Sequence, residues 1–163
     1  MARQPHANGI AILPHPIQVR IQGGTVDPGH VAAVALYHDA TEIFTGDLPT
    51  PVKYANPDIQ AAYKAIEQNA ADRLTATLPE ELRPSFSGFL SETDSQVTDL
   101  VKAADKLSAY LKCLEELKAG NLEFQSAANQ TLEALNEYDL PELTYFMEHF
   151  LPAFQLTLDE LEG

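Results

Sequence analysis

The sequence predicts an all-α protein, and three observations carry that prediction. From residue 27 almost to the end of the chain, apolar residues recur at spacings of three and four, which is the pattern of helices with one buried face. Capping residues, prolines and glycines stand between these stretches and supply starts and stops. No stretch shows the alternation of apolar and polar residues, rich in β-branched side chains, that is typical of a strand.

The first predicted helix begins at Asp27 and Pro28 and ends at Gly46. Aspartate is a good N-cap residue, proline suits the first helical position, and the stretch VAAVALYHDATEIF continues the helical pattern. The segment that follows, GDLPTPVKYANP, contains Pro49, Pro51 and Pro57. Because proline restricts both itself and the residue before it, this segment is predicted to be a rigid, extended loop.

Four further helices are predicted after this loop, together with a short one. Asn56 and Pro57 open a helix that ends near residue 78, and a short helix over residues 79–90 is interrupted around Pro84. Thr93 and Gln96 resemble a capping box at the start of a long central helix, which ends at residue 120. Its apolar stripe consists of Val97, Leu100, Val101, Ala104, Leu107, Leu111, Leu114 and Leu117. Residues 122–137 and 141–154 supply two more helices, the last interrupted at Pro152.

Composition and charge exclude several classes of protein. The longest strictly apolar run is seven residues, 31–37, whereas a membrane-spanning helix needs roughly 20. The first residues do not form a secretory signal, and the single cysteine, Cys113, cannot form an intrachain disulfide, so we expect a cytoplasmic protein. The net charge of −14 repels nucleic acid and anionic membranes. A phosphate ester would also be repelled unless carboxylates held a divalent cation there.

The candidate chemistry lies on the first helix. At about 100° per residue, His38, Asp39 and Glu42 fall within about a third of the helix circumference. An imidazole and two carboxylates at one place suit Mn, Co, Fe, Zn or Mg without selecting among them. The alternative interpretation is a surface ion pair between His38 and Asp39, which is the more common role of such a doublet.

Asp105 on the central helix is the second candidate. It stands beside Ala104 and four residues after Val101, so it borders the buried stripe, and a carboxylate there needs a partner. A cation shared with His38 and Asp39 would provide one. The alternative is a salt bridge to Lys102, Lys106 or another basic side chain.

These residues stand in a sequence that resembles a known family. The stretches YHDATEIFTGDLPTPVKY, YKAIE, PEELR and AYLKCLEEL, together with the segment around Asp105, are similar to the bacterial 5'-deoxynucleotidase branch of the HD-domain metal-dependent phosphohydrolases. The resemblance extends from residue 25 to about 160, and TGDLPTPVKY is its most specific part. It implies an HD-domain bundle of about five to six helices that forms a cytoplasmic homodimer and removes phosphate from deoxyribonucleoside 5'-monophosphates.

The resemblance also implies roles for individual residues. His38, Asp39 and Asp105 are implied to be ligands of a divalent cation such as cobalt or manganese. Glu42 is implied to position or activate the attacking water, so that Glu42 and Asp39 are the expected catalytic residues. The expected substrate-binding residues are Asp39, Asp47, Leu48, Pro49, Thr50 and Asp105. Of these, Asp47 is implied to recognise the sugar and to disfavour a ribose.

The sequence departs from the family pattern near its beginning. The family has a further metal-binding His in a Glu-His-Ser setting and an Arg-Trp pair that contacts phosphate, but this chain contains no Trp and no Glu-His-Ser. We therefore expect residues 1–26 to be an atypical, irregular head and residues 27–163 to be an HD domain truncated at its amino end. The alternative to a working enzyme is a catalytically impaired HD-domain remnant that acts as a nucleotide-binding or dimerisation protein.

Overall fold

The computed structural model describes residues 26–46, 48–53 and 55–156, and over these residues the chain is helical and contains no β-strand. The prediction of an all-α fold is therefore confirmed. The helices follow one another in the order α3 (Pro28–Tyr37), α4 (Glu42–Thr45), α5 (Thr50–Lys53), α6 (Pro57–Ala76), α7 (Arg83–Leu90), α8 (Ser95–Lys118), the 3-10 helix η1 (Leu122–Phe124), α9 (Gln125–Leu135), α10 (Pro141–His149) and α11 (Leu151–Gln155).

The chain divides into two compact units. One unit consists of residues 1–35 and 95–163, and the other of residues 36–94. The boundary after Ala35 lies inside α3, so this helix contributes to both units.

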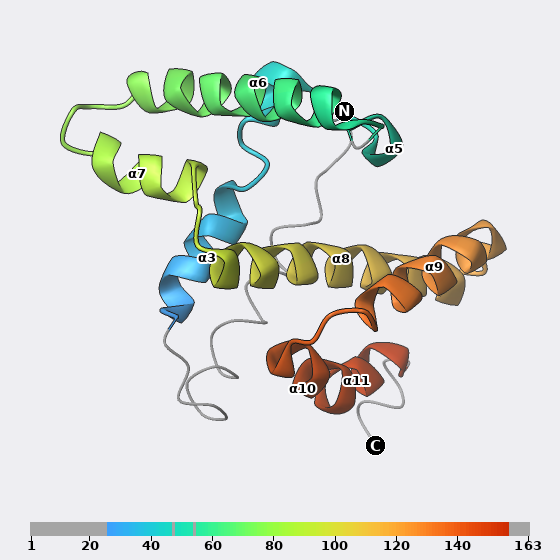
Figure 1. Ribbon diagram of the computed structural model, residues 1–163. Coiled ribbons are helices and arrows are strands. Elements are labelled where there is room, and N and C mark those ends of the chain that lie inside the picture. Colours follow the sequence, from blue (N-terminus) through green and yellow to red (C-terminus); the bar gives the residue numbers. More distant parts are fainter. Residues whose placement is uncertain (1–25, 47, 54, 157–163) are drawn as a thin grey trace. The chain divides into compact units, whose positions relative to one another are not determined.

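The long helix α8 organises the unit that contains the C-terminal half of the chain. Most of the predicted stripe is buried on α8, from Val97 to Leu111, and Leu107 is only 1% exposed. Helix α9 packs against α8, and α10 and α11 follow it, as Figure 1 shows in yellow to red. Phe146 of α10, also 1% exposed, stacks its ring on that of Phe150. Close packing of these large side chains is the main source of stability of this unit.

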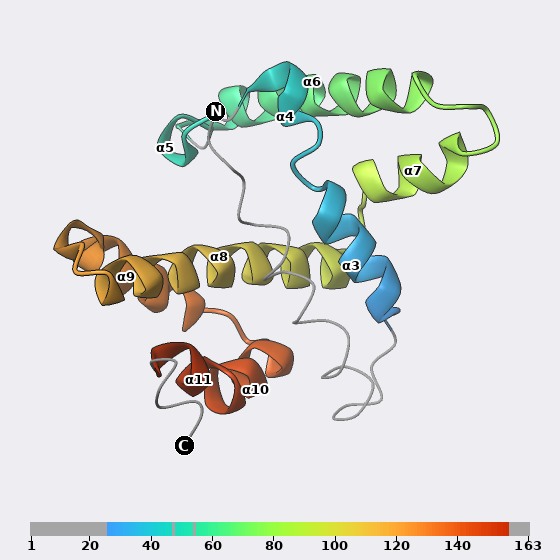
Figure 2. The same cartoon turned by 180° about the vertical axis from the view of Figure 1, so that it is seen from behind.

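Helices α6 and α7 form an antiparallel pair in the unit of residues 36–94 (Figure 2). The start of α6 is the one predicted from the sequence: the Asn56 side chain accepts a hydrogen bond from the Ile59 amide at 2.9 Å, and Pro57 is in the first turn. Aromatic rings supply part of the packing, since Tyr37 lies against Phe86 and Phe89 with ring centroids 5.3 and 6.1 Å apart.

Three local predictions were wrong in detail. The first helix is not continuous to residue 46: α3 ends at Tyr37, and a turn separates it from α4. His, Asp and Thr in this turn are weak helix formers. Part of the proline loop is not extended, because Pro51 is compatible with the first turn of a helix and α5 forms there. The central helix begins at Ser95, so Thr93 stands one residue before the N-cap position.

Other predictions agree with the structure or fall outside it. The last helical segment is interrupted at Phe150, directly before α11 and its Pro152. None of the described helices combines the length and the apolar character that crossing a membrane requires. Almost all of the predicted head, residues 1–26, lies outside the described residues, as do Asp47 and Tyr54.

Candidate functional site

His38 and Asp39 lie in the turn between α3 and α4, and their side chains meet. The Nε2 atom of His38 is 3.0 Å from the Oδ1 atom of Asp39, and the two side chains are 22% and 36% exposed. The turn is built from short-range hydrogen bonds: the amide of Ala40 donates to the carbonyl of Tyr37, and that of Glu42 to the carbonyl of Asp39, both at 3.0 Å. An imidazole nitrogen and a carboxylate oxygen are thus held side by side at a partly accessible place.

Glu42 follows this turn directly as the first residue of α4. The sequence argument placed Glu42 beside His38 and Asp39 on one continuous helix, and that premise was wrong. The tight turn nevertheless brings the backbone of Glu42 close to that of Asp39, because the amide of Glu42 donates a hydrogen bond to the carbonyl of Asp39. Thr41, which lies between Asp39 and Glu42, is only 8% exposed, so the turn is partly buried in the unit of residues 36–94.

The segment after α4 begins with a backbone conformation that favours glycine. Gly46 has a φ of 69°, which a residue with a side chain adopts only with strain. Leu48 is half-buried and Pro49 is exposed, and the Pro49 carbonyl accepts hydrogen bonds from the amides of Val52 and Lys53 at 2.8 and 3.0 Å. Asp47 and the side chain of Thr50 lie outside the described residues.

Helix α6 holds both ends of this segment. The Tyr63 hydroxyl donates to the carbonyl of Gly46 at 3.5 Å, and the ammonium of Lys53 lies 4.5 Å from the centre of the Tyr63 ring. The same ammonium is 2.7 Å from Oε1 of Glu67. This set was not foreseen from the sequence, because nothing in local spacing relates Lys53 to a carboxylate 14 residues away on another helix.

Asp105 lies on α8, in the other compact unit. It is half-buried, and its neighbours Ala103, Ala104 and Leu107 are each no more than 2% exposed. Asp105 therefore borders the buried stripe, as the sequence predicts. Within the described residues, neither unit by itself brings together three or more His, Cys, Asp or Glu side chains that could hold a metal ion. Within the unit of residues 36–94, His38 and Asp39 supply one imidazole and one carboxylate, donor types that a divalent transition metal accepts.

The C-terminal half of α8 carries several groups with shifted pKa values. Burial raises the pKa of the Cys113 thiol, and the nearby negative charge of Glu116 adds to that effect. The hydrogen bond that Lys112 donates to Glu116 lowers the pKa of this carboxyl group, and a second hydrogen bond from Asn121 acts in the same direction. Cys113 is therefore a neutral core residue at physiological pH, with no sign of the low pKa that a nucleophilic thiolate requires.

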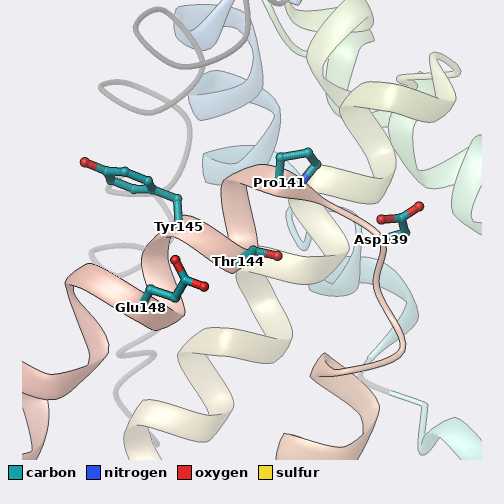
Figure 3. Close-up of a pocket in the computed structure, with 5 residues that line it drawn as sticks. All are labelled: Asp139, Pro141, Thr144, Tyr145 and Glu148. Atoms are coloured by element: carbon teal, nitrogen blue, oxygen red, sulfur yellow. The ribbon is translucent and has the colours of Figure 1, made fainter.

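A separate recess of about 300 Å³ lies at α10. Figure 3 shows Asp139, Pro141, Thr144, Tyr145 and Glu148 around it. Its two charged side chains are both carboxylates, so it is poorly suited to a phosphate ester. Nearby, His149 packs its ring against Tyr145 with centroids 4.2 Å apart.

The fold is that of an HD-domain phosphohydrolase. The structure is similar to a crystal structure of an HD-domain phosphohydrolase from Listeria innocua, with a TM-score of 0.72 over 97% of this chain and 79% of that one. Sequence identity to it is 21%, so this likeness concerns the fold alone.

Sequence comparison then identifies the family. The profile of the family described as 5'-deoxynucleotidase YfbR-like matches residues 5–154. The chain is 46% identical over 161 residues to a 5'-deoxynucleotidase of Vibrio cholerae, covering 96% of this chain and 83% of that one. It is 47% identical, over 96% and 81% of the two chains, to the 5'-deoxynucleotidase YfbR of Escherichia coli. The chain belongs to the YfbR-like 5'-deoxynucleotidase family.

The family expected from the sequence is thereby confirmed. The family match also begins earlier in the chain than residue 25, where the resemblance was expected to begin. It begins at residue 5 and so includes most of residues 1–26. The absence of Trp and of Glu-His-Ser remains a property of this sequence.

Proposed function

We propose that the protein is a 5'-deoxynucleotidase that hydrolyses deoxyribonucleoside 5'-monophosphates to the deoxynucleoside and phosphate, with a divalent cation as cofactor. The observation that carries this proposal is the 46% identity, over nearly the whole chain, to a relative named 5'-deoxynucleotidase. The fold supports it, since the chain shares the architecture of an HD-domain phosphohydrolase.

We assign the metal to His38, Asp39 and Asp105. The contact between Nε2 of His38 and Oδ1 of Asp39 supports this assignment because it holds a nitrogen and an oxygen donor at one place. Asp105 is included because the resemblance to the family implies it as the third ligand. A bound cation such as Mn or Co neutralises phosphate charge and lowers the pKa of water.

The remaining roles belong to residues in and after the same turn. Glu42 orients the attacking water and accepts its proton, and its place directly after the His38–Asp39 turn supports that role. Asp39 and Asp105 also lie against the substrate. Leu48, Pro49 and Thr50 line the nucleotide site, and Asp47 contacts the sugar and rejects a ribose. A loop rich in proline loses little entropy when it holds a substrate.

The net charge of −14 explains why a cation is needed at this site. An anionic protein repels a phosphate monoester at long range, and the carboxylates of Asp39, Glu42 and Asp105 add to the repulsion locally. A divalent cation held by some of these carboxylates reverses the local sign. We further infer that the protein works as a homodimer in the cytoplasm, with no nucleic acid polymer and no membrane as partner.

The alternative is an HD-domain remnant that binds nucleotide or dimerises without turnover. The sequence feature that favours it is the absence of Glu-His-Ser and of Trp, which removes one expected metal ligand and one expected phosphate contact. A charge-assisted contact of that kind is typically worth about 1.5–3 kcal/mol.

The test is phosphate release from dAMP and from AMP, with added Mn or Co, by the wild-type chain and by a Glu42→Gln variant. We expect turnover of dAMP in preference to AMP, and its loss in the variant. Metal content and the melting temperature are measured on the same samples, because a bound ligand raises stability by mass action. No stoichiometric metal, and no rise in melting temperature with Mn and dAMP, would establish the remnant instead. Equal turnover of dAMP and AMP would contradict the role of Asp47.

A further inference from the structure

The segment of residues 46–53 is fastened to α6 at both of its ends, and one side chain takes part in both attachments. Tyr63 is 7% exposed, which makes it a fixed point of its unit. Its hydroxyl donates a long, weak hydrogen bond of 3.5 Å to the Gly46 carbonyl at one end of the segment, and its ring lies 4.5 Å from the ammonium of Lys53 at the other end, which is the stronger attachment.

Glu67 completes the attachment at the second end. One helical turn after Tyr63 on α6, it brings its carboxylate to 2.7 Å from the Lys53 ammonium. The two side chains are only 28% and 31% exposed, so water screens the pair less than it screens an ion pair on an open surface. The ammonium is thus held by a carboxylate and an aromatic ring at once. Both of these contacts join Lys53 to α6.

The structure assigns to Tyr63, Lys53 and Glu67 a positioning role in sugar selection, which rests on the proposed function. We call these three residues the loop clamp. The segment they fasten contains the residues proposed to line the nucleotide site. Distinguishing a deoxyribose from a ribose requires that the residues around the sugar hold their places when the larger sugar presses on them. The loop clamp supplies that rigidity from outside the site.

The test compares three variants that each remove one part of the loop clamp. Lys53→Met removes the charge and keeps the alkyl chain, Glu67→Gln removes the partner charge, and Tyr63→Phe removes the Gly46 contact and keeps the ring. Lys112→Met is the matched control, because Lys112 forms an ion pair of nearly equal length, 2.8 Å, but with Glu116 inside a single helix. Lys53→Arg is the rescue variant, since arginine retains both the charge and the stacking.

We expect the ratio of kcat/KM for dAMP to that for AMP to fall by up to about fivefold in Lys53→Met and Glu67→Gln, because a loosened segment discriminates less between the sugars and the effect cannot exceed the worth of the ionic contact removed. The fall should come mainly from a lower KM for AMP, with little change in kcat for dAMP, because the loosened segment no longer resists the extra hydroxyl of a ribose. Lys112→Met and Lys53→Arg should retain the wild-type ratio. A ratio unchanged in all three loop-clamp variants would overturn the proposal.

Amide hydrogen exchange provides a second measurement that does not need activity. Peptides covering residues 46–53 should exchange faster in the loop-clamp variants than in the wild type and in Lys112→Met. Faster exchange with an unchanged sugar preference means that the loop clamp is structural only and overturns the specificity role. If the wild-type chain turns over no nucleotide, the proposed function fails and the specificity role with it, while exchange still decides whether the loop clamp exists.

Discussion

The imidazole of His38 and the carboxylate of Asp39 lie 3.0 Å apart in the turn that ends α3. Adjacent residues in a regular helix point about 100° away from each other, so this convergence depends on the turn. Hydrogen bonds between residues three apart in the sequence, from 37 to 42, close the turn and place Glu42 at its end. An imidazole and two carboxyl groups are thereby carried by the five consecutive residues from His38 to Glu42.

The first prediction concerns Asp105 as the metal ligand supplied by α8. Asp105→Asn should lower the affinity for Mn by about tenfold or more, which is the usual loss when a metal site is altered. In a thermal scan, added Mn should raise the melting temperature of the wild type and raise that of the variant much less. Asp99→Asn is the control, because Asp99 is on the same helix, is 52% exposed and pairs with Lys102. An equal rise in all three proteins would remove Asp105 from the metal site.

The second prediction concerns Glu42 as the base. Glu42→Gln preserves size but cannot accept the proton of the attacking water, so kcat for dAMP should fall by about 10²- to 10⁴-fold while KM changes little. Stability in Mn should stay close to that of the wild type, because Glu42 is not assigned as a ligand. A kcat close to that of the wild type would refute the assignment.

The third prediction concerns the reactivity of Cys113. The thiol is 6% exposed, and burial followed by the charge of Glu116 raises its pKa. In the folded chain it should react with a colorimetric disulfide reagent at least about tenfold more slowly than in denaturant, since the thiolate is the reactive form. Reaction at the same rate in both conditions would show that this part of α8 opens readily.

The fourth prediction concerns Lys118 at the end of α8. Its ammonium donates hydrogen bonds to the carbonyl oxygens of Phe154 and Leu156, the latter at 2.7 Å. These carbonyls stand at the end of α11, where they have no partner within the helix. Lys118→Met should reduce the free energy of unfolding by about 1 kcal/mol, measured with urea. Lys102→Met removes only an exposed ion pair within α8 and should cost less than about 0.5 kcal/mol.

The fifth prediction concerns pH and Glu116. Hydrogen bonds from Lys112 and Asn121, and the charge of Lys112, lower its pKa below the ordinary value of 4.5. Because the folded pKa is the lower one, the contribution to stability is present above about pH 4.5 and is lost as the pH falls through the folded pKa. The difference in unfolding free energy between wild type and Glu116→Gln should therefore be constant near pH 7 and shrink in acid. A difference that grows in acid would contradict this ionisation.

The site could be predicted from the sequence only in part. His38 and Asp39 converge as predicted, in a turn and not on a continuous helix, and their direct contact is compatible both with a shared metal and with the alternative of an ion pair. The half-buried place of Asp105 beside the stripe also agrees. The roles of these residues stay predictions. Lys53, Tyr63 and Glu67 could not be found, because their contacts join separate helices and no local pattern encodes them.

By itself the sequence determined the elements whose signals are local. Asn56 and Pro57 start α6, and the stripe from Val97 to Leu111 is the buried face of α8. The last helical segment is interrupted just before Pro152. Capping and helical periodicity act over a few residues, so they can be recognised without the fold. Only the tertiary structure decided where the first helix ends and which carboxylate of α6 forms an ion pair with Lys53. The contact of Lys53 joins residues far apart in the chain, whereas at the end of α3 the burial of Thr41 adds to the weak helical preference of the turn, so that neither outcome follows from the periodic pattern alone.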